Sequence, residues 1–357
     1  MDTPSREPYA ERMRRFASLL LTLPLFTACA TTSEISGSNT GGSGATTTAG
    51  GGGATGTTTS GEAGTTDTTG TGGTTTTSAP LTCSGKTGPL DDSSLKIMFS
   101  GALRDADVHV PPQYDPTVPT ALILDFHGFT WNAYQQELLD DMKSAVDERG
   151  YLVVYPNGLN LSWNAGDCCG VSAAAEVNDV GYVSALIDKL SELYCIDPAR
   201  VFATGMSNGA FLAHRLGCEL SSKIAAIAPV AGDIGIPLET CNPSRKVPVM
   251  DFHGTLDAVV PWVGGTIDNF PSVDDSVGRW REIDGCSNAT DVTYDKGDSQ
   301  CVTWKGCADC SEVTLCTITG GRHTWPGGTP VPALGWTTMD LDATNAMLDF
   351  FEKHPMN

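Results

Sequence analysis

Residues 200–218, RVFATGMSNGAFLAHRLGC, carry the pattern from which the fold can be inferred. Residues 200–204 predict a short buried strand, because residues 201–203 are apolar in succession, and residues 210–218 have apolar side chains at helical spacing. Between them, residues 205–209 match G-x-S-x-G, in which a serine occupies a sharp strand-to-helix turn with its hydroxyl above the sheet. The glycine at each end of the motif lets strand and helix approach closely. We therefore predict a nucleophile elbow at Ser207 rather than a chance match.

Apolar strands alternate with amphipathic helices along the rest of the chain. The predicted strands are residues 105–110, 120–126, 151–155, 200–204, 225–230, 247–252 and 313–319, and the predicted helices are residues 136–149, 178–194 and 343–354. Strands that are apolar throughout and separated by helices are typical of a parallel sheet covered on both faces. Such sheets bind ligands at the carboxyl ends of their strands. The sequence therefore predicts an α/β fold with a mostly parallel central sheet.

A nucleophilic serine needs a histidine base and an acid that orients it, and α/β-hydrolases place them in the order serine, acid, histidine. Asp257 is the predicted acid, since it lies on the loop after the predicted strand 247–252. Its rivals are Asp251 at the end of that strand and the exposed-looking Asp274 and Asp275.

His323 is the predicted base, because it follows the last predicted strand and lies downstream of Asp257 in the glycine-flanked loop 320–328. His127 and His253 each end an Asp-Phe-His-Gly stretch upstream of the acid, where we expect them to shape loops by hydrogen bonding near the site. The other histidines lie in an early strand, in the helix after the elbow and near the C-terminus: His109, His214 and His354.

These residues predict acyl transfer. His323 would accept the proton of Ser207 as its oxygen attacks an ester carbonyl, while Asp257 holds the imidazole tautomer. The charge that develops on the carbonyl oxygen needs preorganised donors, and the backbone N–H groups of Asn208 and Phe129 are the predicted pair.

The formal net charge of −21 argues against a nucleic-acid partner and against adhesion to an anionic membrane surface. Eleven cysteines follow Cys29, a density that predicts structural disulfides in an exported chain. Cys307 and Cys310 have a metal-like spacing, but no second pair stands at ligand distance in the sequence, so we expect a disulfide and no metal. Cys168 and Cys169 are adjacent, and we expect each to bond to a separate partner.

Residues 1–80 predict export and tethering. Residues 1–29 have a basic start, an apolar run and a small-residue site before Cys29, which together suggest a signal peptide that ends in a lipobox. Lipidation of Cys29 and plain secretion after nearby cleavage both stay open. Residues 30–80 are Gly, Thr, Ser and Ala almost throughout and predict a disordered linker. Residues 81–357 remain as the catalytic domain.

Four stretches occur together and in order: 163–170 (WNAGDCCG), 205–209 (GMSNG), 253–261 (HGTLDAVVP) and 323–327 (HTWPG). As a set they resemble the extracellular polyhydroxybutyrate depolymerase / feruloyl esterase family, which is close to carbohydrate esterase family 1. Over about residues 83–355, the resemblance implies an α/β-hydrolase fold, a triad of Ser207, Asp257 and His323, and no cofactor. Members of the family commonly have small residues at two positions that are Arg322 and Phe129 in this chain. Either residue could narrow the entrance of the site or change its charge.

The sequence therefore predicts a secreted serine carboxylesterase for feruloyl or acetyl esters of plant polysaccharide. Hydrolysis of polyhydroxybutyrate or its oligomers is the alternative, and a non-catalytic surface-binding lipoprotein is an alternative of another class. Trp163 and Trp325 lie in loops expected to border the pocket, and we predict that both, together with His127, contact the substrate.

Overall fold

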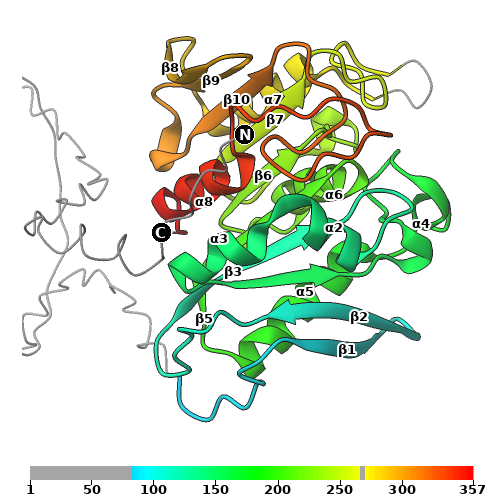
Figure 1. Cartoon of the computed structure of the whole chain (residues 1–357), viewed down its shortest axis with the longest axis vertical. Helices are drawn as coiled ribbons and strands as arrows, with labels where there is room; N and C mark the ends of the chain where they lie inside the picture. Colours follow the sequence, from blue (N-terminus) through cyan, green and yellow to red (C-terminus); the bar gives the residue numbers. More distant parts are fainter. Residues whose placement is uncertain (1–82, 266–269, 357) are drawn as a thin grey trace, which may run out of the picture. The chain divides into compact units, whose positions relative to one another are not determined.

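The computed structural model describes residues 83–265 and 270–356, and these form one ten-stranded sheet (Figure 1). Its spatial order is β1-β2-β4-β3-β5-β6-β7-β10-β9-β8. The strands are β1 (Ser93–Phe99), β2 (Ala102–His109), β3 (Thr120–Phe126), β4 (Leu152–Pro156), β5 (Ile196–Met206), β6 (Ala226–Val230), β7 (Val249–Gly254), β8 (Thr290–Lys296), β9 (Ser299–Trp304) and β10 (Val313–Ile318).

The centre of the sheet is parallel and its edges are antiparallel. Strands β4, β3, β5, β6, β7 and β10 all run the same way. Antiparallel β2 and β1 complete one side, and the β9–β8 hairpin completes the other. Central strands such as β3 and β4 are buried along their whole length, as parallel strands covered on both faces require. The predicted α/β-hydrolase fold is confirmed.

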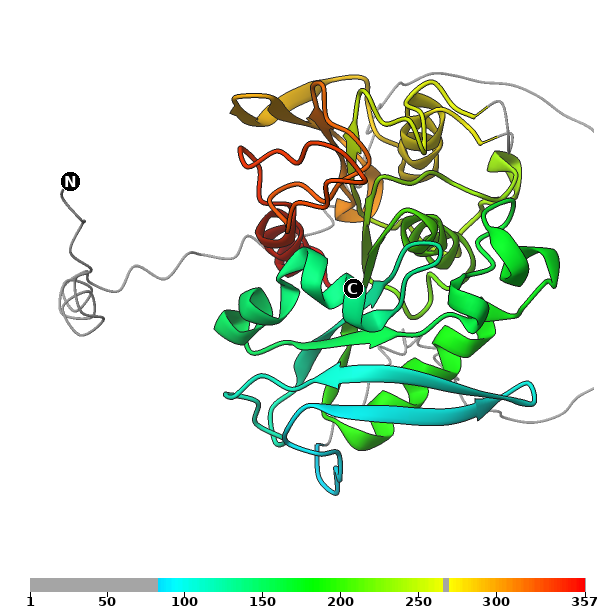
Figure 2. The ribbon, with the colours of Figure 1, turned by 45° about the vertical axis from the view of Figure 1, so that its right-hand side comes forward.

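Helices cover both faces of the sheet (Figures 1 and 2). One core lies under α5 (Asp179–Leu193), α6 (Asn208–Glu219) and α7 (Val273–Asp284), and the other under α2 (Ala133–Asp140), α3 (Met142–Arg149) and α8 (Ala343–Lys353). Successive strand residues alternate between the two: Leu122 and Leu124 belong to the first core, and Ala121 and Ile123 to the second. The short α4 (Gly170–Ala174) lies in the segment between β4 and α5.

Two parts of the fold differ from the sequence-based prediction. The single helix predicted over 136–149 is wrong: Asp141 has φ 52°, and this left-handed residue separates α2 from α3. Strand β1, the short α4, the β8–β9 hairpin and α7 were not predicted. Every residue of β8 except Tyr294 is exposed, so this strand lacks the apolar run that revealed the others.

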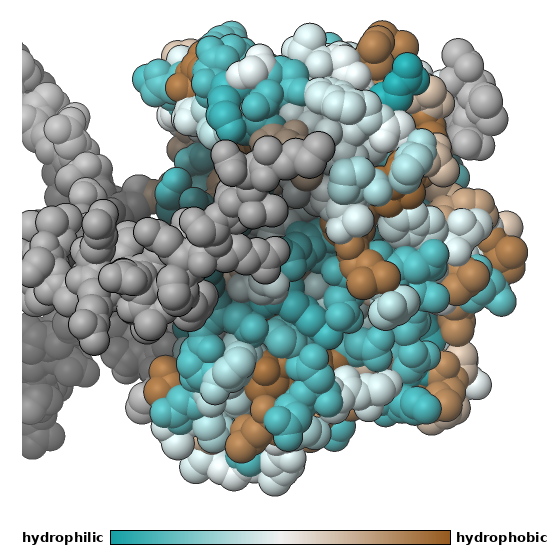
Figure 3. Space-filling model, viewed as in Figure 1, coloured by the Kyte–Doolittle hydropathy of each residue, from teal (hydrophilic) through white to brown (hydrophobic). Residues whose placement is uncertain are grey.

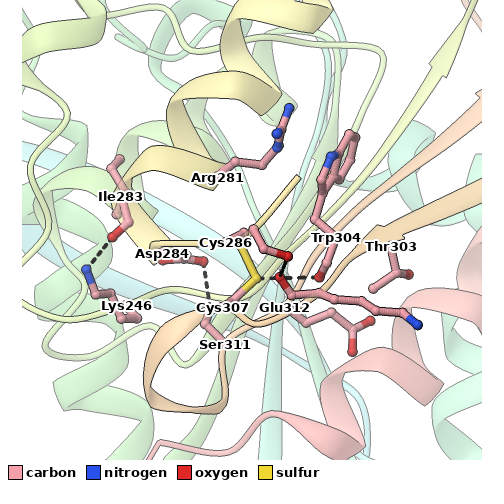
Figure 4. The surroundings of a disulfide bond; sticks show 12 residues. Lys246, Arg281, Ile283, Asp284, Cys286, Thr303, Trp304, Cys307, Ser311 and Glu312 are labelled. Atoms are coloured by element: carbon pink, nitrogen blue, oxygen red, sulfur yellow. Dashed lines mark hydrogen bonds between the residues drawn. A yellow bond between two sulfur atoms is a disulfide. The ribbon is translucent and has the colours of Figure 1, made fainter. Parts of the chain in front are cut away.

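Five disulfides join described cysteines: Cys83–Cys195, Cys168–Cys169, Cys218–Cys241, Cys286–Cys307 and Cys301–Cys316. They indicate an oxidising, extracellular environment. The expectation that Cys168 and Cys169 bond to separate partners is wrong, because their two sulfur atoms form a disulfide with each other. Cys307 is held by a disulfide to Cys286, as Figure 4 shows.

The predictions for residues 1–29, with Cys29, and for residues 30–80 lie outside the described residues. Within the described ranges, no helix is both long and apolar enough to cross a membrane. On the face seen in Figure 3, hydrophobic residues lie in small groups between polar ones, as is usual for a protein surface.

Two carboxyl groups are buried between β3 and α2. Asp125 and Asp140 have almost no exposed surface, and Asp140 accepts hydrogen bonds from Gln136 Nε2 at 3.1 Å and from Tyr155 Oη at 3.2 Å. Burial raises the pKa of Asp125 to about 7. Burial, together with the charge of Asp125, raises the pKa of Asp140 well above its usual range. The pair therefore retains a proton near neutral pH.

This pair should make stability fall as the pH rises from 5 to 7. The folded protein then holds a proton that the unfolded chain has already lost, so the free energy of unfolding declines by up to about 1.4 kcal/mol per pH unit from this source. Asp125→Asn should reduce that slope, because it leaves only the buried Asp140 to titrate, and urea unfolding at pH 5, 6, 7 and 8 measures the change. Asp274→Asn, at an exposed position on α7, serves as the control. Parallel pH profiles for Asp125→Asn and the wild type would contradict the expectation.

Candidate active site

Ser207 lies between β5 and α6 in a strained backbone conformation, with φ 57° and ψ −122°. Non-glycine residues adopt positive φ only when their surroundings enforce it. Here the enforcing contact is the close approach of the elbow to the end of β3. A Cβ on Gly205 would lie 2.5 Å from the carbonyl oxygen of Phe126, and a Cβ on Gly209 would collide with the same oxygen. The motif therefore needs both glycines, as its sequence suggests.

Asp257 and His323 are joined directly. His323 Nδ1 donates to Asp257 Oδ2 over 2.7 Å, and both side chains are buried. The other carboxylate oxygen, Oδ1, accepts from the backbone N–H groups of Val259 at 2.8 Å and Val260 at 2.9 Å. With Nδ1 protonated, Nε2 of His323 is left as the basic nitrogen.

The acid is held in its ionised form. Burial by itself would raise the pKa of Asp257, but the hydrogen bond and charge of His323, with the backbone donor of Val260, lower it below its usual value. His253 supports the same loop, since its Nε2 donates to the carbonyl of Val260 at 2.9 Å. This hydrogen bond agrees with the loop-shaping role expected of His253.

The three predicted catalytic residues lie at the carboxyl ends of parallel strands. Ser207 follows β5, Asp257 follows β7 and His323 follows β10. No hydrogen bond joins the hydroxyl of Ser207 to another described residue, and such bonds are often long before substrate binds. Two of the three rival acids are engaged elsewhere: Asp251 Oδ2 lies 3.4 Å from His214 Nε2, and Asp275 completes the N-terminal capping box of α7. The third, Asp274, is exposed in the first turn of α7.

The loop after β3 presents one predicted oxyanion donor. His127 Nε2 accepts from the N–H of Gly158 at 2.9 Å, so the proton resides on Nδ1, which donates to the carbonyl of Gly128 at 2.8 Å. The N–H of Trp131 binds the same carbonyl. Since a trans peptide points its N–H opposite to its C=O, fixing this carbonyl also fixes the N–H of Phe129, which donates to no described residue.

Burial and the charge of Arg104 lower the pKa of His127 to about 4, so the imidazole is neutral at working pH. A neutral ring with one donor and one acceptor is the form that both of its hydrogen bonds require.

The second predicted donor is the backbone N–H of Asn208, which starts α6 and makes no bond to a described residue. Its side chain is locked against Trp163: Oδ1 accepts from the Trp163 N–H at 2.7 Å, and Nδ2 donates to the Trp163 carbonyl at 3.1 Å. The indole N–H of Trp163 in turn donates to the carbonyl of His127 at 3.0 Å. Trp163 thus bridges the two segments that carry the predicted oxyanion donors.

The predicted substrate contacts of Trp163, Trp325 and His127 need correction, because all three side chains are fully buried. Trp163 packs edge-on against Phe126, at 5.3 Å between ring centroids. The indole N–H of Trp325 donates to Thr344 Oγ1 on α8 at 2.9 Å. Both indole N–H groups have hydrogen-bond partners inside the protein. The two rings therefore pack in the interior and do not line the surface of the site.

Sequence reasoning missed a buried ion pair that supports this region. Arg104 and Asp179 meet at 2.8 Å with almost no exposure. Asp179 is the first residue of α5 but not its cap, because the side chain of Asn178 accepts from Gly181 N. Asp179 Oδ2 instead accepts from the N–H of Asn164 at 2.8 Å, next to Trp163. No sequence signal marks this pairing, since the partners are 75 residues apart.

Exposed apolar side chains flank the predicted catalytic residues. Leu256 and Val259 lie on either side of Asp257, and the backbone carbonyl of exposed Trp336 accepts from Thr324, next to His323. Three further exposed apolar residues are Phe129 after β3, Leu161 after β4 and Val171 on α4.

Relatives of this chain are esterases. It is 28% identical over 247 residues to feruloyl esterase B of Piromyces equi, a match that covers 65% of this chain and 44% of that protein. It is 27% identical over 228 residues to the bifunctional acetylxylan esterase/xylanase XynS20E of Neocallimastix patriciarum, covering 62% of this chain and 31% of that protein. The match thus spans less than half the length of each of these curated relatives. No protein-family model matches the chain.

Among solved structures, the acetyl xylan esterase from Aspergillus awamori aligns with a TM-score of 0.55 at 12% identity, covering 73% of this chain and 99% of that one. This likeness concerns the fold. The predicted relation to feruloyl esterases is confirmed, whereas the polyhydroxybutyrate depolymerase part of the resemblance stays a prediction.

Asp179→Ala should destabilise the protein by about 3–5 kcal/mol, because it leaves Arg104 buried without its partner. Glu192→Ala is the matched control on the same helix, since it removes an exposed carboxylate that pairs with Lys189. The control should cost less than about 1 kcal/mol. Urea unfolding of both variants measures how much free energy of unfolding each one loses. Equal losses would show that the buried ion pair stabilises the protein no more than the exposed one.

Proposed function

We propose that this chain, which the comparisons group with the carbohydrate esterase-like feruloyl esterases, is a serine hydrolase that cleaves feruloyl or acetyl esters of plant polysaccharide. The observation that carries the proposal is the 2.7 Å hydrogen bond from His323 to ionised Asp257. Ser207, in its strained conformation, lies at the same carboxyl end of the parallel strands. That arrangement supplies a base, its orienting acid and a nucleophile at the carboxyl ends of the parallel strands, in the chain order that the fold requires.

In the proposed mechanism, Nε2 of His323 takes the proton of Ser207 Oγ as this oxygen bonds to the ester carbonyl carbon. The carbonyl oxygen becomes an oxyanion that accepts from the N–H groups of Phe129 and Asn208. Collapse of the intermediate breaks the ester C–O bond, and His323 returns its proton to the leaving alcohol. Water then repeats the cycle on the acyl-enzyme and releases the carboxylic acid.

The exposed apolar residues support an aromatic acyl group. Phe129 is 44% exposed and Trp336 is 53% exposed, although burial of such rings is normally favourable. A hydroxycinnamoyl ring would cover apolar surface of this kind, whereas an acetyl group would cover little of it.

Ser207→Ala should lower kcat on methyl ferulate and p-nitrophenyl acetate by a factor of about 10⁴ or more, since the nucleophile is lost. The measurement is a steady-state assay of both esters and a 3-hydroxybutyrate oligomer. Ferulate turnover well above that of the oligomer is the expected result. The reverse preference would identify a polyester oligomer hydrolase. Equal turnover by wild type and variant would rule out the triad, and no turnover of any of these esters by the wild type would favour a non-catalytic binding lipoprotein.

We further propose that the protein is exported and that Cys29 carries lipid, on the strength of the basic and apolar start of residues 1–29. Expressed as the full chain in a bacterial host, the protein should partition into detergent, and Cys29→Ala should release it to the aqueous phase. Aqueous partitioning of both forms would favour plain secretion. Esterase activity should be the same in either phase, since Cys29 is distant in sequence from the catalytic domain.

A further inference from the structure

The Cys168–Cys169 disulfide contacts the side chain of one proposed oxyanion residue. Asn208 Nδ2 lies 3.5 Å from Cys168 Sγ while it also donates to the carbonyl of Trp163. The disulfide segment is tied to the same neighbour, because the N–H of Cys169 donates to the Trp163 carbonyl at 3.4 Å. The side-chain amide of Asn208 is therefore held between the sulfur of Cys168 and the backbone of Trp163.

Gly170, which follows Cys169, contacts Phe129, the second proposed oxyanion residue. Gly170 has φ 68°, and a Cβ added there would collide with the ring of Phe129. The ring thus lies directly on the backbone that follows Cys169. The ring of Phe129 is partly exposed, and this backbone packs against one side of it.

The disulfide is poorly suited to stabilising the whole fold. Its cysteines are one residue apart, whereas Cys83–Cys195 closes a loop of 112 residues. The chain-entropy benefit of a cross-link grows with the length of the loop it closes. A bridge between neighbours therefore acts mainly on local geometry.

We propose that the Cys168–Cys169 disulfide is a positioning element of the oxyanion hole, holding Asn208 and Phe129 so that their backbone N–H groups converge on one oxygen. This inference rests on the proposed function. Loss of one oxyanion donor lowers kcat by about 100- to 1,000-fold, and loosening both without removing either should cost less. Because oxyanion donors bind the transition state more strongly than the substrate, the effect should fall on kcat rather than on KM.

The test compares two disulfide deletions in the full chain. Cys168→Ser/Cys169→Ser should lower kcat on p-nitrophenyl acetate by about 10- to 100-fold, change KM by less than about threefold and leave Tm almost unchanged. The matched control is Cys286→Ser/Cys307→Ser. That bridge joins the end of α7 to the segment before β10, beside Asp284 and Ser311, and so lies at the opposite end of β10 from His323 (Figure 4). The control should lower Tm and keep kcat.

Unchanged kcat in a folded Cys168→Ser/Cys169→Ser variant would overturn the proposal, as would equal losses of kcat in both variants. Should the variant fail to fold, brief phosphine treatment of the wild type takes its place, because Cys169 is partly exposed. Peptide mapping would report thiols at Cys168 and Cys169, and activity should fall with their appearance and return on reoxidation. Full activity with both thiols free would overturn the proposal.

Ser207→Ala separates this inference from the proposed function. If Ser207→Ala abolishes activity and the Cys168→Ser/Cys169→Ser variant stays fully active, the oxyanion inference alone fails. If Ser207→Ala remains active, the proposed function fails as well.

Discussion

The rest of the site depends on the close approach of helix α6 to the end of strand β3. That approach leaves no room for a side chain at Gly205 or Gly209, and it holds Ser207 at a positive φ that serine does not favour. The same contact places the carbonyl of Phe126 beside the elbow, so the loop that begins at His127 must start there too. Nucleophile and oxyanion loop are thus positioned by one packing constraint rather than by two.

Around this constraint, the protein uses a buried network of neutral hydrogen bonds. The amide of Asn208, the backbone and indole of Trp163, and the uncharged ring of His127 all find partners within the network. Satisfied polar groups in a low-dielectric interior are rigid, since breaking any one bond leaves an unpaired group. Rigidity of this kind is what an oxyanion hole needs, because donors that must reorganise during the reaction lose much of their effect.

Much of the fold and part of the site were predictable, and the particular failures have physical causes. Apolar strands such as residues 120–126 stand out because both of their faces are buried. Strand β8 does not stand out, because its side chains face solvent. The 2.7 Å contact of Asp257 with His323 follows from chain order and strand ends. The burial of Trp163 and Trp325 does not, since an indole on a loop can pack inward or face a ligand, and only tertiary partners such as Thr344 decide which.

The two borders of the sheet have a consequence for how copies of this protein behave when crowded. In the described part of the chain, β1 and β8 are the two outermost strands, and an outer strand can present backbone groups that another chain could pair with. Both borders carry charge: Lys96 lies on β1, and β8 holds Asp291, Asp295 and Lys296. Lys305 on the segment after β9 pairs with Asp291 at 2.6 Å. Charged, solvated borders of this kind disfavour strand-to-strand aggregation between copies of the protein.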